Sequence, residues 1–330
     1  MSKIHDLLDQ IRDDVAPSDT TLNTAREHRD AVLSSAGSFD GALRTYRSGS
    51  IAHGTANDDT DADCGVVLDR RVWSALGPDG DDDGPGHAVE QVRSKVRSDL
   101  NDDGWDVSTR LTKRAIEVKF PDGPSVDLIV GLTRKNAVGL WIPNLHAGSW
   151  DASHPERHTE LLTDGPKALR VTRARAIRLA KTWNKQPTQP GLCSFNLEAL
   201  ALSAVESGMG VPEALHAIAD YGATDLAKRL TPDPADVSPP IKLLIDRAIV
   251  VSRLTALASS LAKALESDDD DEVQDLIAAA FPNYLEPADR QSQASISASL
   301  RGGNEGARYT ASGIAVGAGS QVKTTRSFGG

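Results

Sequence analysis

Three aspartates in the first half of the chain have the type and spacing needed to bind divalent cations. Asp61 and Asp63 are separated by one residue and come directly before an apolar run at 64–68, which predicts that they begin a β-strand. Side chains at positions i and i+2 of a strand point to the same face, so both carboxylates can reach one ion. Carboxylate oxygens are the ligands that Mg²⁺ prefers. Asp127, in the strand-like segment 125–130, supplies a third carboxylate.

A glycine-containing turn precedes these aspartates and has the composition of a phosphate-binding segment. It reads Gly49-Ser50-Ile51-Ala52-His53-Gly54-Thr55. Backbone N–H groups of a Gly-Ser turn can bind phosphate oxygens together with the Ser50 hydroxyl. His53 is expected to be a hydrogen-bonded spacer and not a base.

Neither motif is specific alone, because polar turns and acidic loops produce both by chance. Their order along the chain, with strand character after the paired aspartates, predicts a two-metal nucleotidyltransferase site. In this interpretation Asp61 and Asp63 bind both ions, and Asp127 completes the site where an attacking hydroxyl is activated.

A basic segment from Lys167 to Lys185 contains no acidic residue. At about 100° per residue its apolar side chains gather on one face of a helix. A second face, which we name the cation stripe, gathers Lys167, Arg170, Arg178, Lys181 and Lys185. Such a face is by default solvated surface, but the lack of acidic partners favours a role for part of it in facing a triphosphate.

Composition limits the classes of protein and partner. Of 330 residues, 39% are hydrophobic and 25% are charged, as is usual for a globular protein. The formal net charge of -11 argues against long nucleic acids binding over the whole surface, although a local basic cleft remains compatible with it. Because Cys64 and Cys193 are the two cysteines, neither a disulfide framework nor a Cys-rich zinc site is expected.

Signals for secretion or membrane insertion are not found in the sequence. The amino terminus lacks the apolar core of a signal peptide, and we expect no apolar run to approach the length of a membrane span. The expectation is a cytoplasmic protein without a membrane partner.

The spacing of apolar residues predicts an α+β protein, with a mixed sheet in the first half of the chain and a mostly helical second half. The predicted helices are 3–15, 18–37, 89–100, 167–185, 194–207, 212–230, 240–266 and 271–280, and the predicted strands are 43–47, 61–68 and several between 105 and 130. Residues 140–160, with Pro143 and Pro155, are expected to be irregular. The chain then divides into a sheet lobe with N-terminal helices (1–150), a helical lobe (151–286) and a flexible tail poor in large apolar residues (287–330).

These motifs resemble those of polymerase-β-type nucleotidyltransferases. The matching segments of the first half are Gly49-Ser50…Gly54-Thr55, Asp61-Ala62-Asp63 and Ser125-Val126-Asp127. In the second half, Lys181-Thr182-Trp183-Asn184 and Leu192-Cys193-Ser194-Phe195-Asn196-Leu197-Glu198 resemble a pattern of bacterial cGAS/DncV-like enzymes (CD-NTases) and of oligoadenylate synthases. The resemblance covers roughly residues 1–285 and so includes both predicted lobes.

The resemblance implies a bilobed polymerase-β-like fold whose oligoadenylate-synthase-like helical lobe closes over the nucleotides. It implies synthesis of a cyclic oligonucleotide second messenger from ATP, GTP or other NTPs with two Mg²⁺ or Mn²⁺ ions, within a CBASS anti-phage system. By position, Gly49, Ser50 and Thr55 bind the donor nucleotide, and Lys181 with Ser194 holds its outer phosphates. Because no zinc-binding Cys/His cluster is found, DNA activation as in animal cGAS is not expected.

The chain ends in Gly329-Gly330, which suggests a further hypothesis. In type II CBASS systems an E1/E2-like ligase conjugates the nucleotidyltransferase through its C-terminal residue. A flexible tail ending in glycine offers reach and no side chain near the activated carboxylate of Gly330. The alternative is a disordered tail that ends in glycine by chance.

Two other functions are compatible with the sequence. A nucleotidyltransferase of this kind can also add nucleotides linearly or to another acceptor, such as an RNA end or a small molecule. A protein of another class would bind nucleotides as a regulator without turnover. The three aspartates argue against a regulator, because clustered carboxylates repel one another when no metal is bound.

Overall fold

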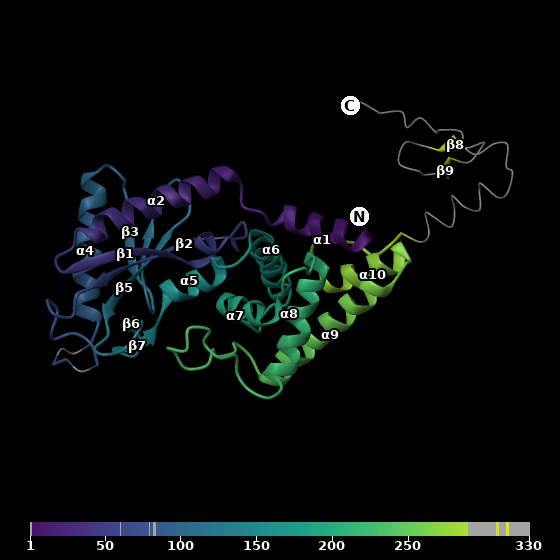
Figure 1. The fold of residues 1–330 in the computed structure, drawn as a ribbon. Helices are drawn as coiled ribbons and strands as arrows, with labels where there is room; N and C mark the ends of the chain where they lie inside the picture. Colours follow the sequence, from purple (N-terminus) through teal and green to yellow (C-terminus); the bar gives the residue numbers. More distant parts are fainter. Residues whose placement is uncertain are drawn as a thin grey trace, which may run out of the picture.

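The computed structural model describes residues 2–59, 61–78, 80–81 and 84–289, together with the backbone of β8 (Arg308–Tyr309) and β9 (Ala315–Val316). Figure 1 shows two lobes side by side, one built on a sheet and one built from helices. The predicted α+β bilobed fold is therefore confirmed. Gly330 and most of the predicted tail 287–330 lie outside the described residues.

A seven-stranded mixed sheet forms the centre of the first lobe. Its strands are β1 (Ala42–Ser48), β2 (Ala62–Leu68), β3 (Ser108–Leu111), β4 (Ile116–Lys119), β5 (Val126–Thr133), β6 (Leu140–Asn144) and β7 (Ser149–Ser153). The order across the sheet is β1-β2-β5-β4-β3, and β6 joins β5 to β7. Strands β2 and β5 run parallel, so two strands distant in sequence begin at the same edge of the sheet.

Strict alternation of side chains gives the sheet two different faces. Cys64, Val66 and Leu68 of β2 are fully buried and pack, with alternate residues of β5, against α2 (Asp19–Gly37) and α4 (Gly86–Asp102). These two helices cover one face (Figure 1). Asp63, at the other parity, belongs to the opposite face, and Asp61 lies just before β2. The helices thus bury one face, while the opposite face carries Asp63 at its end and a smaller apolar cluster that includes Tyr46 and Val67.

In the part of the chain that the structure describes, six helices form the helical lobe around one apolar core, which Leu162 of α5 (Pro155–Thr163) also joins. They are α1 (Lys3–Asp14), α6 (Lys167–Asn184), α7 (Ser194–Ala204), α8 (Val211–Leu226), α9 (Arg247–Glu266) and α10 (Asp270–Ala280). Helix α1 packs here through Ile4, Leu7, Leu8 and Ile11, although the sequence interpretation placed the N-terminal helices in the sheet lobe. The chain therefore crosses from the helical lobe to the sheet lobe between α1 and α2.

Helix α9 corrects the expectation about membrane spans. Among the described residues it is the one helix long and apolar enough, by length and composition, to cross a membrane. Its side chains Leu254, Leu257 and Leu261 are buried in the helical core, and α9 contacts α8 and α10. A core helix passes the same test of composition, and packing accounts for these three leucines, while Ile249 of α9 is 47% exposed.

Residues 140–160 are regular, and the prediction of an irregular segment was wrong. Strands β6 and β7 form a hairpin, and α5 (Pro155–Thr163) follows with proline in its first turn. Pro143 pairs with Trp150 of β7 but lies beyond Trp141, where pairing of β6 with β5 ends. Its missing N–H therefore removes no bond to β5, and proline is tolerated there.

Candidate functional site

One register row across the sheet collects the acidic side chains. Asp63 of β2 lies opposite Asp127 of β5, and Asp127 lies opposite Glu117 of β4. Residues paired in register point to the same face, so the three carboxylates form a row, which we name the carboxylate row. Ser48 of β1 continues the row beside Asp63, and Arg110 of β3 continues it beside Glu117. The sheet therefore brings together Asp63 and Asp127, as the sequence predicted.

The carboxylate row carries more negative charge than the described residues compensate. Burial raises the pKa of Asp63 to about 7, and the charges of Asp61 and Asp127 contribute to this rise. Burial likewise raises the pKa of Asp127 to about 6, helped by the charges of Asp61 and Glu117. Glu117 differs, because the Arg110 Nε donates to its Oε2 at 2.8 Å and lowers its pKa. Asp63 and Asp127 have the electrostatics of a site that receives a cation.

Oxygen ligands on adjacent strands fit Mg²⁺ by chemistry. In the part of the chain that the structure describes, however, no group of three His, Cys, Asp or Glu side chains converges as a ready-made metal site. Asp61 lies just before β2, and its side chain is exposed. Metal ligation by Asp61, Asp63 and Asp127 together therefore stays a prediction.

The predicted phosphate turn folds as a short helix, α3 (Gly49–His53), followed by Gly54 in the left-handed conformation. Gly49 has φ +71°, and a Cβ there would lie 1.8 Å from Oδ2 of Asp63. Only glycine satisfies both conditions, since any side chain would overlap the carboxylate. Ser50 is half-buried beside it. The glycine thus lets the turn approach the carboxylate row directly.

The far end of the turn is bound to the helical lobe through a buried network of His53, Thr55, Lys181 and Glu198, which we name the Glu198 network. Glu198 Oε1 accepts from Thr55 Oγ1 at 2.6 Å and from Lys181 Nζ at 2.8 Å. His53 Nδ1 lies 3.2 Å from Glu198 Oε2, and its Nε2 lies 3.0 Å from Thr159 Oγ1 of α5. The predicted spacer His53 is hydrogen-bonded at both ring nitrogens.

Glu198 is ionised in spite of its burial. Burial alone would raise the pKa of this carboxyl group, but the hydrogen bond to His53 and the charge of Lys181 lower it to about 2. Side chains of Lys181 and Glu198 are 6% and 5% exposed. The network therefore contains a buried ion pair between Lys181 and Glu198.

The loop from Thr55 to Asp59 runs along α6. Arg178 Nε donates to the Ala56 carbonyl oxygen at 2.6 Å, and Asn57 Nδ2 donates to Thr182 Oγ1 at 3.1 Å. Lys185 forms an ion pair with Asp59. Positions 178, 181, 182 and 185 share one face of a helix. The C-terminal half of the cation stripe thus holds the loop that leads to Asp61.

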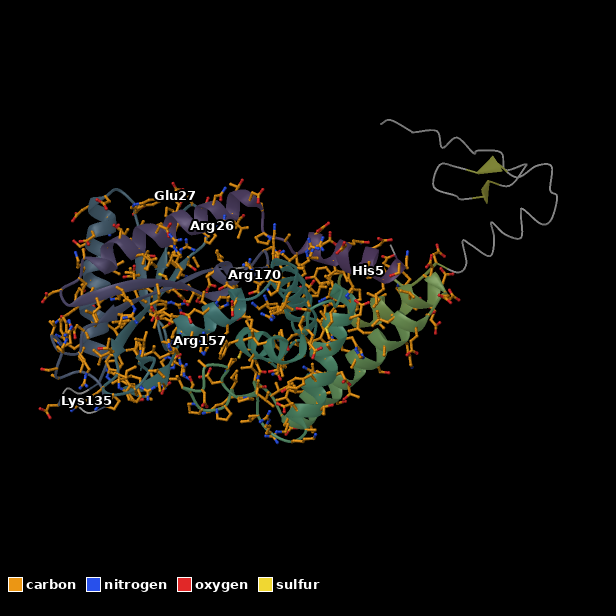
Figure 2. All side chains as sticks on the ribbon, viewed as in Figure 1. His5, Arg26, Glu27, Lys135, Arg157 and Arg170 are labelled. Atoms are coloured by element: carbon orange, nitrogen blue, oxygen red, sulfur yellow. The ribbon has the colours of Figure 1, made fainter. Side chains whose placement is uncertain are left out.

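The N-terminal half of the cation stripe is different. Lys167 and Arg170 are exposed, and in the view of Figure 2 Arg170 of α6 and Arg157 of α5 lie between the two lobes. The stripe is therefore two regions, one in contact with the 55–59 loop and one facing solvent.

Ser194, predicted to hold outer phosphates, is exposed at the first position of α7. Glu198 follows four residues later and lies on the same side of the helix. Sequence reasoning assigned no role to Glu198, although an acid inside the apolar run of α7 was a signal of a buried partner. It also missed Glu117, whose place between Ile116 and Val118 puts it on the same face of the sheet as Asp127.

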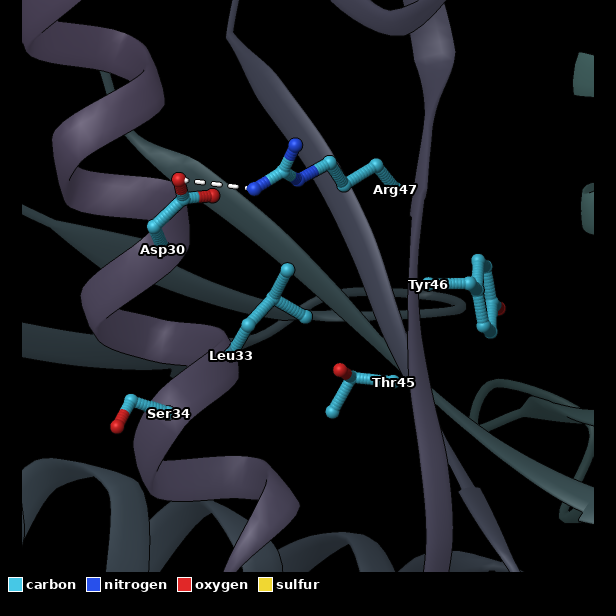
Figure 3. Close-up of a pocket in the computed structure, with 6 residues that line it drawn as sticks. All are labelled: Asp30, Leu33, Ser34, Thr45, Tyr46 and Arg47. Atoms are coloured by element: carbon cyan, nitrogen blue, oxygen red, sulfur yellow. Dashed lines mark hydrogen bonds and ion pairs between the residues drawn. The ribbon is translucent and has the colours of Figure 1, made fainter.

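A cavity of about 500 Å³ lies elsewhere, between α2 and β1. Figure 3 shows Thr45 and Arg47 of β1 pointing toward α2, where Arg47 pairs with Asp30, while Tyr46 points to the other side. Ser48, which shares the parity of Tyr46, is the β1 residue opposite Asp63. The cavity is therefore on the wrong face of the sheet to be the predicted site.

Comparisons with known proteins place the fold. No family model and no curated protein sequence matches the chain. The structure is similar to that of Escherichia coli MS115-1 CdnC with ATP, with a TM-score of 0.66 and 17% identity over 86% of this chain and 98% of that one. The Bradyrhizobium diazoefficiens CD-NTase CdnG with GTP gives a TM-score of 0.62 and 17% identity over 85% and 96%.

Vibrio cholerae DncV, a cyclic AMP-GMP synthase described as a prokaryotic cGAS homologue, gives a TM-score of 0.54 and 17% identity over 74% and 70% of the two chains. All three share the polymerase-β-like fold of CD-NTases, and the resemblance predicted from the motifs is confirmed at the level of the fold.

Proposed function

We propose that the protein is a nucleotidyltransferase that joins nucleoside triphosphates into a cyclic oligonucleotide and releases pyrophosphate. The observation that carries the proposal is the register of β2 and β5, which sets Asp63 beside Asp127, with the Gly49 turn against Asp63. The similar structures support it: that of CdnC holds ATP, that of CdnG holds GTP, and DncV is a cyclic AMP-GMP synthase.

The chain's residues would divide the work along the carboxylate row. Gly49, Ser50 and Thr55 would bind the donor nucleotide at the β1 side, with Ser194 facing its outer phosphates. Asp127 would orient the attacking hydroxyl of the acceptor. Asp61, Asp63 and Asp127 would hold two Mg²⁺ or Mn²⁺ ions, which supply positive charge to the phosphoryl group and to the leaving pyrophosphate.

Lys181 already has hydrogen-bond partners within the protein. The resemblance assigns it to the outer phosphates, but its ammonium now lies within hydrogen-bond distance of Glu198 and Thr55. A direct phosphate contact would require the ammonium to exchange one of these partners.

The test is incubation of purified protein with all four labelled NTPs and Mg²⁺ or Mn²⁺, followed by phosphatase treatment, chromatography and mass spectrometry. A phosphatase-resistant product without free ends is expected, and its mass identifies the bases. Phosphatase-sensitive products would establish linear or acceptor-directed transfer instead. Nucleotide binding without pyrophosphate release under any of these conditions would favour a regulator over an enzyme.

The biological setting belongs to the same proposal. We place the enzyme in the cytoplasm, where NTPs are available, as the signal-producing component of a CBASS anti-phage system. Conjugation of Gly330 by an E1/E2-like ligase is a separate part of the proposal, and Gly330 lies outside the described residues. Unchanged conjugation beside a co-expressed ligase after deletion of Gly330 would reject that part alone.

A further inference from the structure

The Glu198 network joins three segments that are far apart in sequence. His53 and Thr55 come from the end of the phosphate turn, Lys181 from α6 and Glu198 from α7. Counted as whole residues, Thr55, Lys181 and Glu198 are 1%, 5% and 4% exposed. A buried ion pair is tolerated only when its remaining donors and acceptors also find partners. The contacts of each member therefore decide what the network does.

The network uses every donor of the Lys181 ammonium. An ammonium group has three N–H donors. Those of Lys181 reach Glu198 Oε1 at 2.8 Å, Thr55 Oγ1 at 3.0 Å and the Thr55 carbonyl oxygen at 3.4 Å. None of the three is left for a phosphate oxygen in this arrangement.

Both carboxylate oxygens of Glu198 also have hydrogen-bond partners. Oε1 accepts hydrogen bonds from Thr55 Oγ1 and Lys181 Nζ, while Oε2 contacts His53 Nδ1. Two of these three partners belong to the turn, and only Lys181 belongs to the helical lobe. Glu198 thus contacts two side chains of the turn, whereas Lys181 contacts one.

We propose that Glu198 is a positioning residue that fixes the end of the phosphate turn to the helical lobe, and that Lys181 serves as its counterion and not as a phosphate ligand. The turn is then held at two ends, by Gly49 against Asp63 and by Thr55 and His53 against Glu198. This inference rests on the proposed function only for what the turn binds. The positioning itself is a property of the protein without nucleotide.

The first experiment measures coupling between the two charges without nucleotide. Glu198→Gln and Lys181→Met each leave one buried charge without a partner, so each should lower the melting temperature strongly. The double variant removes both charges and should melt above either single variant. Lys185→Met is the matched control on the same face, where the ion pair with Asp59 is 46% and 60% exposed and little should change. The counterion role would be overturned if the double variant lowered the melting temperature by the sum of the two single-variant losses.

The second experiment follows the turn itself by amide hydrogen exchange and uses milder variants in case Glu198→Gln does not fold. Thr55→Val keeps the shape but removes the hydroxyl, and Thr55→Ser keeps the hydroxyl. Exchange of residues 49–57 should become roughly tenfold faster or more in Thr55→Val, recover in Thr55→Ser, and stay unchanged in α4. Equal exchange in both variants and wild type would overturn the positioning role.

The third experiment separates counterion from phosphate ligand by ATP affinity. A counterion predicts that Lys181→Met weakens ATP binding and that the double variant with Glu198→Gln restores it to within about threefold of wild type. A phosphate ligand predicts the same loss in both backgrounds, which would overturn the inference. If the wild type binds no ATP, the proposed function fails, while the melting and exchange experiments still decide the role of Glu198.

Discussion

Buried acids in the carboxylate row and in the Glu198 network have opposite electrostatics. Burial and neighbouring carboxylates raise the pKa of Asp63 to about 7, whereas His53 and Lys181 overcome burial and lower the pKa of Glu198 to about 2. The difference lies in the partners: Glu198 has a hydrogen bond with His53 and the charge of Lys181 beside it, while neither Asp63 nor Asp127 forms an ion pair with a described residue. An acid with its own cation holds structure together, and an acid without one is suited to receive an ion.

The largest expected effect is on turnover. Asp63→Asn removes a carboxylate from the row and should lower pyrophosphate release by about 10³-fold, because metal-based charge stabilisation is worth several kcal/mol in the transition state. Asp59→Asn is the matched control. Asp59 lies four residues before Asp63, is exposed, and forms its ion pair with Lys185. Both are measured with NTPs and Mg²⁺. Equal turnover of Asp63→Asn and Asp59→Asn would remove Asp63 from the site.

In the metal-free protein, neutralising an acid should change the unfolding free energy in opposite directions in the two regions. At about pH 8, Glu198→Gln leaves the Lys181 charge buried alone and should cost about 3–5 kcal/mol of unfolding free energy. Asp63→Asn removes an uncompensated charge and should raise that free energy. The measurement is urea unfolding in EDTA. A loss of stability in both variants would mean that Asp63 has a structural partner like that of Glu198.

How far the sequence predicts these regions depends on the range of the interactions involved. Alternation along a strand is local, and it set Asp63 on the face of β2 that α2 and α4 do not cover. Asp61 lies just before β2, so its place beside Asp63 in a shared site stays a prediction. The register that pairs Asp63 with Asp127 needs β2 and β5 to meet, which the shared acidic pattern suggested but local spacing could not establish.

Lys181 shows where sequence reasoning reaches its limit. Helical periodicity correctly placed it on a basic face of α6, and the lack of acids within 167–185 made a phosphate partner attractive. The acid that pairs with it, Glu198, lies on the next helix, and Thr55 lies in the other lobe. Burial of a charge depends on such distant partners, so a solvated or phosphate-facing lysine and a buried ion-paired lysine have the same local pattern.

The pH dependence of metal-free stability should also differ between the regions. In the unfolded state Asp63 ionises near the ordinary aspartate pKa of 3.8, but the folded state retains the proton up to about 7. The folded protein therefore binds more protons between these values, and its stability falls as pH rises through them, with Asp127 adding to the fall up to about pH 6. For Glu198 the stabilisation is complete above pH 4.5 and is lost as pH falls toward about 2.

Urea unfolding in EDTA across this pH range measures both slopes. Asp63→Asn should flatten the fall between pH 3.8 and about 7. Mg²⁺ in place of EDTA should do the same in the wild type, because a bound ion replaces the proton. A slope that persists in Asp63→Asn and Asp127→Asn would assign it to other groups.

Two glycines in the same conformation test how closely the turn contacts the carboxylate row. Gly49 and Gly54 have φ of +71° and +72°, but a Cβ meets Asp63 at Gly49 and nothing within 4 Å at Gly54. Alanine at either position should cost about 1–2 kcal/mol of unfolding free energy from backbone strain. Gly49→Ala should cost more unfolding free energy than Gly54→Ala, and it should also lower Mg²⁺-dependent turnover. Gly54→Ala is the control, because it introduces the same backbone strain without the overlap with Asp63. Equal effects on stability and turnover would show that contact with Asp63 is unimportant.

The smallest expected effect comes from the ion pair next to the Glu198 network. Lys185 and Lys181 lie four residues apart on the same face of α6, and each pairs with one acid. Because the Lys185–Asp59 pair is exposed to solvent, Lys185→Met should change the unfolding free energy by about 0–1 kcal/mol, and added salt should reduce even that. Lys181→Met, with a buried partner, should cost several times more and respond little to salt. Similar losses and similar salt dependence for the two variants would mean that burial does not distinguish the pairs. The Glu198 network would then be an ordinary surface contact, and the contrast with the carboxylate row would rest on Asp63 and Asp127 alone.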